Sequence, residues 1–312
     1  MNLRRNLAVA GVSLASLLLA ACGGGGGADP LAAPSSAASS AASGGSEAVV
    51  VGSAAFTEST IVAELYAQAI SAKGVEASTK LNIGSREVYL KALEDGSISI
   101  VPEYTGNLLL NYDKKAAATT AEEVEQALPE ALPADFKLGT PSAAVDQDVY
   151  VVTKEYSDAN GVKSLADLKK VAGDAVLGGP SELATRAYGP EGLEQVYGAK
   201  LKQFKPYDSG AVRARDLNDG KIQIGEFFST ESVIPDNGYV VLEDPQAMIL
   251  PQNVVPLYRA EVASNTAVTG AVDAVQQALT TEELTALNKK VDVDKSDADD
   301  VAKEWLTSKG LV

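Results

Sequence analysis

The chain has 312 residues with a formal net charge of −16, one cysteine and no histidine. A surface this acidic argues against binding to nucleic acid and against docking onto anionic lipid. The lack of histidine removes the commonest general base and the commonest metal ligand, and a lone cysteine leaves no internal disulfide. We therefore expect no cofactor, no metal site and no catalytic residues.

The first 21 residues are typical of a secretion signal. Arg4 and Arg5 precede an apolar stretch, Leu7–Ala21, which is too short for a comfortable membrane span. Cys22 follows Leu19-Ala20-Ala21, and this spacing resembles a lipobox, where the signal is cut before the cysteine and the thiol takes a diacylglycerol. We therefore predict a signal peptide over residues 1–21, lipidation of Cys22 and an extracytoplasmic protein that contacts the membrane through its lipid anchor only.

Residues 22–46 are predicted to form a flexible tether. Of the 24 residues from 23 to 46, 22 are Gly, Ala, Ser or Pro, so the segment cannot bury enough apolar surface to offset its ordering entropy. The remaining sequence contains no apolar run of about 18 residues and is long enough for two domains of ordinary size.

From residue 48 onward, short apolar runs typical of strands alternate with stretches typical of helices. The predicted strands are Ala48–Val51, Ile98–Val101, Val149–Thr153, Ala175–Leu177, Ile222–Gly225 and Tyr239–Leu242. The predicted helices include Thr60–Lys73, Arg86–Asp95 and several within Asn265–Lys309. Thr120 with Glu123 and Ser164 with Asp167 fit N-terminal capping boxes. This alternation predicts an α/β fold with mainly parallel sheets.

An internal repeat indicates two similar halves. Leu93–Ile100 and Leu217–Ile224 both contain a helix end, a glycine and a strand, 124 positions apart. At the same offset Tyr104-Thr105 matches Phe228-Ser229, and Glu58 matches Glu182. Two α/β lobes that present strand ends to a shared crevice would place a ligand there.

Several motifs along the chain occur together in one known family. Gly52–Glu58 resembles a Gly-Ser-Lys-x-Phe-Thr-Glu opening and Pro102–Gly106 matches a Pro-Glu-Tyr-Thr-Gly block; Gly178–Glu182 with Arg186, Phe228–Thr230 and Val254–Pro256 follow in the same order. Over about residues 48–262 the set resembles the glycine betaine/carnitine/choline-binding proteins of ABC importers. The resemblance implies a binding protein rather than an enzyme, which captures a quaternary amine and passes it to an ABC transporter permease.

The resemblance also implies a bilobal type II periplasmic-binding fold, in which two α/β lobes are joined by two crossover strands. We place the crossovers near residues 146–150 and 250–256. Lobe 1 is then expected at residues 48–147 plus 254–312, and lobe 2 at residues 148–253.

Quaternary ammonium ligands have no N–H to donate, so a site holds them by cation–π contact with aromatic faces. By resemblance, Tyr104, Tyr150 and Phe228 correspond to cage positions and Asp148 to an acidic neighbour. Thr105 and Asn107, next to Tyr104, are also predicted to bind the ligand. The family's last cage tyrosine falls near Gln252 or Asn253, where this chain has no aromatic residue.

The family's usual carboxylate-binding Lys is Ala54 here. Arg186 remains, four residues after Glu182, and the pair is expected to share one face of a helix. Arg86 opens another helix and offers a substitute anchor, because a guanidinium fork donates two parallel hydrogen bonds to a carboxylate. We include Arg86, Glu182 and Arg186 among the expected ligand-binding residues.

Alternatives stay open at this stage. Tyr104, Tyr150 and Phe228 each also fit a packing role, Phe227 rivals Phe228, and packing is favoured for Phe56 and Trp305. The lost Lys and Tyr positions are also compatible with the same importer role for a different small amine, an amino-acid derivative or an aromatic solute. An enzyme or a purely structural lipoprotein is less well supported, because no nucleophile motif or metal-ligand cluster is evident.

Overall fold

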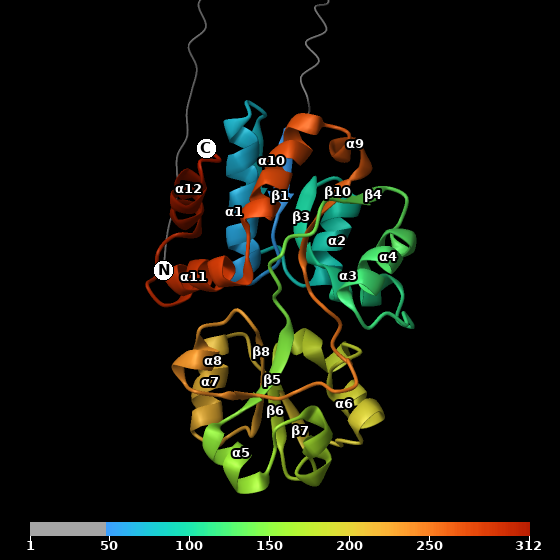
Figure 1. Ribbon diagram of the computed structural model, residues 1–312, viewed down its shortest axis with the longest axis vertical. Helices are drawn as coiled ribbons and strands as arrows, with labels where there is room; N and C mark the ends of the chain where they lie inside the picture. The colour runs from blue at the N-terminus through green and yellow to red at the C-terminus, as the bar shows by residue number, and fades with distance from the viewer. Residues whose placement is uncertain (1–47) are drawn as a thin grey trace, which may run out of the picture. The chain divides into compact units, whose positions relative to one another are not determined.

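The computed structural model describes residues 48–312, which form two five-stranded sheets with helices packed against them (Figure 1). The predicted signal peptide, Cys22 and the tether lie outside the described residues. The α/β class expected from the alternating pattern is confirmed.

The first sheet has the order β2-β1-β3-β10-β4. Its strands are β1 (Val49–Gly52), β2 (Ala77–Lys80), β3 (Ile100–Tyr104), β4 (Phe136–Leu138) and β10 (Val254–Arg259). β1 pairs in parallel with β2 and β3, whereas β10 is antiparallel to both β3 and β4. One strand, β10, therefore runs against the other four.

The second sheet repeats this plan in the order β7-β6-β8-β5-β9. Its strands are β5 (Asp148–Val152), β6 (Val176–Gly179), β7 (Gln203–Pro206), β8 (Ile224–Phe228) and β9 (Val240–Val241). Here β5 is the reversed strand, antiparallel to β8 and β9. In each sheet, the reversed strand is the first strand after the chain crosses over from the other sheet. Both sheets are mixed, because each contains parallel and antiparallel pairs.

Helices cover both sheets. Those of the first sheet are α1 (Thr57–Ala72), α2 (Arg86–Glu94), α3 (Thr105–Tyr112), α4 (Ala121–Ala131), α9 (Ala260–Ala263), α10 (Thr266–Ala278), α11 (Thr281–Asp292) and α12 (Ala298–Lys309). Those of the second are α5 (Lys154–Asn160), α6 (Pro190–Tyr197), α7 (Gly210–Asn218), α8 (Val233–Asp236) and the 3₁₀ helices η1 (Leu165–Lys170) and η2 (Ser181–Thr185). We call each sheet with its helices lobe 1 and lobe 2, respectively.

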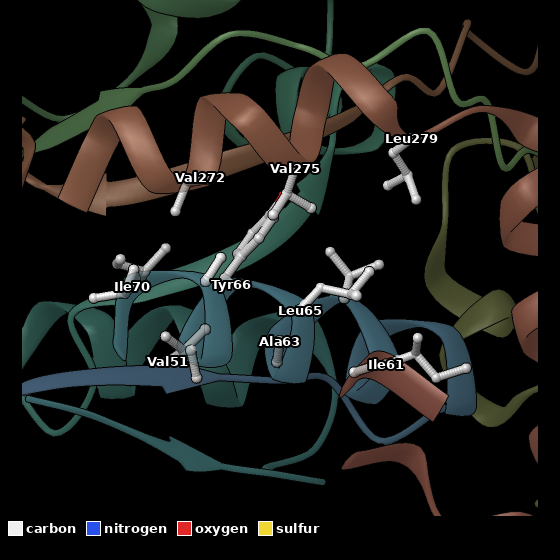
Figure 2. Close-up of a cluster of buried hydrophobic side chains, with 14 of the residues drawn as sticks. Val51, Ile61, Ala63, Leu65, Tyr66, Ile70, Val272, Val275 and Leu279 are labelled. Atoms are coloured by element: carbon white, nitrogen blue, oxygen red, sulfur yellow. The ribbon is translucent and has the colours of Figure 1, made fainter. Parts of the chain in front are cut away.

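The core of lobe 1 is built around α1. Ile61, Leu65, Tyr66 and Ile70 are fully buried, and they pack against Val272, Val275 and Leu279 (Figure 2). The helix is enclosed by the sheet on one side and by α10–α12 on the other, which explains why its apolar residues form no narrow stripe. Trp305 on α12 belongs to the same cluster, as predicted.

Local start signals act as predicted, with one difference. The Thr120 hydroxyl and the Glu123 carboxylate form a capping box at α4. The Ser164–Asp167 capping box also forms, but it opens the 3₁₀ helix η1 rather than an α-helix. β5 begins at Asp148 and β10 at Val254, while the division of the chain there into separate lobes stays a prediction.

Candidate functional site

A cleft of about 840 Å³ lies between the two lobes. Lobe 1 contributes the first turns of α1 and α2, the end of β3 and part of α3; lobe 2 contributes the segment after β6, the first turn of α7 and the end of β8. In open α/β sheets, ligands bind in such crevices at the carboxyl ends of the strands. Seven of the predicted binding residues line it: Arg86, Tyr104, Asn107, Asp148, Glu182, Arg186 and Phe228.

Three aromatic rings gather in the cleft from both lobes. The ring of Phe56 lies 6.0 Å from that of Tyr104 and 5.1 Å from that of Phe228, centroid to centroid, with tilted planes. Tyr104 and Phe228 end the equivalent strands β3 and β8, which is where the internal repeat paired them. Phe56 precedes α1 and lines the cleft as well as packing against the core, so packing alone does not describe its position.

Sequence reasoning missed three further tyrosines that line the cleft: Tyr89, Tyr188 and Tyr207. A signal existed for Tyr89, because it follows Arg86 by three positions on α2 and so occupies the same helix face. Tyr188 stands two residues after Arg186, but without a regular element around it no periodicity indicates where its side chain lies.

Two of the predicted residues do not line the cleft. Tyr150 is 1 % exposed in the core of lobe 2, where its hydroxyl donates to the carbonyl of Tyr188 at 2.5 Å. It lies two positions beyond Asp148 on the same strand face, which places it about 7 Å further into the lobe. Thr105 donates to the Pro251 carbonyl and accepts from the amide of Asn253, both at 3.1 Å, and so fixes the start of α3 to the chain before β10.

The two positions near which the family's last cage tyrosine falls are Gln252 and Asn253, and neither is aromatic. Gln252 is fully buried, and its Oε1 accepts a hydrogen bond from the amide of Asn107 at 2.9 Å. The side chain of Asn107 faces the other way and donates to Asp148 Oδ2 at 2.8 Å. Asp148 is 5 % exposed, so the cleft holds an almost buried carboxylate close to the aromatic rings.

Arg86 is fixed by a carboxylate of its own lobe. Its Nε and Nη2 donate to the two oxygens of Glu103, each at 2.9 Å, and Glu103 also accepts from the Tyr89 hydroxyl at 2.8 Å. Burial alone would lower the pKa of Arg86, but the charge of Glu103 raises it well above its usual value. The charge that Arg86 was expected to offer a ligand is thus already balanced.

Arg186 does not pair with Glu182. η2 ends at Thr185, and Arg186 has an extended backbone, so the expected helix face shared by the two residues is absent. Instead, Arg186 Nη1 donates across the cleft to Glu87 Oε1 on α2, at 2.5 Å. This hydrogen bond lowers the pKa of Glu87 to about 2.

A buried acidic network also joins the lobes. Glu58 of α1 accepts hydrogen bonds from the hydroxyls of Tyr104 at 2.8 Å and Thr230 at 2.6 Å and from Asn288 Nδ2 at 2.7 Å. Asp146 accepts from the Thr230 amide at 3.1 Å and lies close enough to Glu58 for the two charges to interact. Burial raises the pKa of Glu58, and burial with the neighbouring Glu58 charge raises the pKa of Asp146 well above its usual value. Because the two carboxyls are buried close together, the ionisation of each disfavours that of the other.

Chemically, the cleft offers aromatic faces, carboxylates and arginines that are already paired with carboxylates of the chain. Within residues 48–312, no group of three or more His, Cys, Asp or Glu side chains is arranged to hold a metal ion. In the same range no helix is both long enough and apolar enough to span a bilayer.

Comparison with protein families gives a match over nearly all described residues. The model of the substrate-binding domain of ABC-type glycine betaine transport systems matches residues 47–308. The glycine betaine-binding protein YehZ of Escherichia coli is 25% identical over 274 residues, which are 83% of this chain and 90% of that protein. A glycine-betaine-binding protein of Pseudomonas aeruginosa is 25% identical over 278 residues, 84% of this chain and 88% of that protein.

Solved structures give the same fold. The crystal structure of a glycine betaine/carnitine/choline ABC transporter protein superposes with a TM-score of 0.68 at 22% identity, covering 84% of this chain and 99% of the other. The fold is that of the type II periplasmic-binding proteins, as the sequence motifs implied.

Proposed function

Because this chain belongs to the family of substrate-binding domains of ABC-type glycine betaine transport systems, we propose that its cleft captures a quaternary amine such as glycine betaine, carnitine or choline. The family binds a solute for transport and is not a family of enzymes. The protein then hands the ligand to the permease of its importer, with no covalent step.

The observation that carries this proposal is the arrangement of aromatic rings beside a buried carboxylate. A quaternary ammonium group offers no hydrogen-bond donor and is held by ring faces, each worth on the order of 0.5–2 kcal/mol. Phe56, Tyr104 and Phe228 supply such faces from both lobes, and Asp148 supplies a negative charge. The relatives named as glycine betaine-binding proteins support the same class of ligand.

Capture is proposed to close the two lobes by a hinge at the passages near residues 146–150 and 250–256. The lobe boundaries at residues 147 and 254 belong to this proposal. So do the removal of residues 1–21 and the lipid on Cys22, which would hold the protein outside the cytoplasmic membrane near its permease.

Calorimetric titration of the purified full-length chain with glycine betaine, carnitine and choline, and with their dimethyl and monomethyl analogues, tests the proposal. We expect affinity to fall stepwise as methyl groups are removed, since each methyl contacts an aromatic face. Titration of ordinary amino acids serves as the control. An absence of binding by every quaternary amine would refute the ligand class.

Variants of Tyr104 locate the site. Tyr104→Ala removes one ring and should weaken binding by at least ~1 kcal/mol, about fivefold in Kd. Tyr104→Phe keeps the ring and removes only the hydroxyl that donates to Glu58, so it should bind almost as the wild type does. Thermal melts of both variants separate lost binding from lost folding. Equal affinities for all three proteins would place the ligand elsewhere.

The second candidate ligand is a different small amine, an amino-acid derivative or an aromatic solute. The buried Gln252 favours it, because an aromatic wall is missing where the family usually has one. Tight binding of one of these solutes, with no loss on removal of methyl groups, would support this candidate within the same importer role.

A further inference from the structure

Four cationic side chains line the cleft: Arg86, Arg186, Arg213 and Lys295. A ligand that carries a carboxylate next to its quaternary amine needs one of them, because an arginine fork is the natural partner of a carboxylate. The position at which the family usually has a Lys is Ala54, which also lines the cleft.

The three arginines are each already paired with a carboxylate of the chain, whereas Lys295 contacts only a backbone carbonyl. Arg86 forms two hydrogen bonds with Glu103. Arg213 lies 3.4 Å from Glu231 and 3.9 Å from Glu226, nitrogen to oxygen. Lys295 donates to the carbonyl of Asp292 at 2.5 Å. Arg186 is bound by Glu87.

The Arg186–Glu87 pair differs from the other ion pairs between residues 48 and 312, because its partners come from different lobes. Arg186 is 16% exposed at its side chain, whereas Glu87 is 56% exposed. A ligand carboxylate that binds Arg186 therefore competes with Glu87, which is exposed enough to turn out into solvent. Binding of the ligand carboxylate would replace the Glu87 carboxylate at Arg186, so the ligand would gain little net attraction from this arginine.

We propose that Glu87 is a specificity-determining residue, which occupies Arg186 as a built-in carboxylate and so favours cationic amines that lack a carboxylate over zwitterionic betaines. The inference rests on the proposed function, since it concerns which quaternary amines the cleft prefers. Its physical basis is competition for one guanidinium, added to the negative field of exposed acids on the cleft wall such as Asp208 and Asp236.

The test compares choline with glycine betaine by calorimetric titration of the wild-type chain and the Glu87→Gln variant. Choline should bind the wild type more tightly than glycine betaine does. Glu87→Gln removes the negative charge that competes for Arg186, so the ratio of the choline Kd to the betaine Kd should rise by about fivefold, the upper range for a solvent-exposed ion pair. High salt should diminish this change, because exposed pairs are screened.

Asp208→Asn is the matched control. It removes the same charge from an exposed residue of the cleft wall but touches neither Arg186 nor Glu87. It should change the ratio of the choline Kd to the betaine Kd much less than Glu87→Gln does, because it weakens only the general negative field and leaves the Arg186–Glu87 pair in place. A Glu87→Gln effect that is equal for both ligands, or tighter betaine than choline binding by the wild type, would overturn the inference while leaving the quaternary-amine function intact. Binding of neither ligand by any variant would overturn both.

Discussion

Each lobe buries an arginine beside a glutamate behind its wall of the cleft, and the two pairs are built differently. In lobe 1, Arg86 and Glu103 are joined by two hydrogen bonds of 2.9 Å. The remaining capacity of Glu103 is used by the Tyr89 hydroxyl at 2.8 Å and by the amide of Tyr104 at 3.0 Å. This network fixes the residue that carries one of the aromatic faces.

In lobe 2, Arg213 and Glu226 are buried to a similar degree but are poorly joined. Their closest nitrogen and oxygen atoms are 3.9 Å apart, and among the described residues neither oxygen of Glu226 nor Nε of Arg213 has a hydrogen-bond partner. The guanidinium carbon of Arg213 lies 4.2 Å from the centre of the Phe227 ring, which partly compensates its charge. Burial raises the pKa of Glu226 well above its usual value, although the charge of Arg213 opposes the rise.

The comparison shows that two Arg–Glu pairs with similar burial and similar separation in sequence can differ greatly in how well they are joined by hydrogen bonds. A buried carboxylate without partners can take up a proton and become neutral, whereas a guanidinium stays charged at any physiological pH. Lobe 1 therefore depends on its glutamate, because Glu103 is the only carboxylate paired with Arg86 among residues 48–312. Lobe 2 tolerates an incomplete pair because Glu226 can be neutral while Glu231, 3.4 Å from Arg213, remains as a counterion.

The largest expected effect comes from breaking the lobe 1 pair. Glu103→Gln leaves Arg86 as a buried charge without a counterion and should cost about 3–5 kcal/mol in the free energy of unfolding. Urea denaturation at neutral pH measures this loss. Ligand affinity should fall as well, since Tyr104 loses a fixed neighbour. A loss below about 1 kcal/mol would show that Glu103 contributes no more than Glu226 does.

Glu58 and Asp146, between the lobes, extend this comparison, because these two buried acids lie together with no cation paired to either of them among residues 48–312. The raised pKa values of Glu58 and Asp146 mean that the folded state holds a proton that the unfolded state has already released. Their contribution to stability is complete below the unfolded pKa values and is lost as pH rises through the folded ones. Asp146→Asn retains an acceptor for Thr230 and removes one acid.

We therefore expect Asp146→Asn to gain stability relative to the wild type as pH rises from about 4 to 8, by about 1–2 kcal/mol. Thermal melts of both proteins over this range measure the difference. The wild type and the variant should have similar stability at the acid end. A constant difference in melting temperature across the whole range would show that the pKa of Asp146 is not raised in the folded state.

The sequence predicted the features that depend on local patterns. The paired positions Tyr104 and Phe228 were identified by the internal repeat, and both end equivalent strands at the cleft. The capping boxes and the burial of Trp305 were also predictable, because each depends on neighbours close in sequence.

Features that depend on partners far away in sequence were not predictable. Arg186 was expected to share a helix face with Glu182, four residues away, yet its partner Glu87 lies 99 positions earlier in the other lobe. Tyr150 has the right residue type at a matching position, but only the direction of its strand into the lobe shows that its ring lies in the core and not at the cleft. No alternation pattern indicates which end of a strand faces a cleft.

The smallest effect is expected from Glu226→Gln, which tests the other half of the comparison. Gln resembles the neutral acid in shape, and Glu231 and the Phe227 ring remain near Arg213, so stability at neutral pH should change by less than about 1 kcal/mol.

The raised pKa of Glu226 determines how the stability difference between the wild type and Glu226→Gln changes with pH. The wild type loses stability as pH rises through that pKa, and the variant does not, so the variant should become the more stable protein in alkaline solution. Urea denaturation at pH values of about 6 and 9 checks both statements, and a loss as large as that of Glu103→Gln would mean that Glu226 is ionised and balances Arg213 as Glu103 balances Arg86.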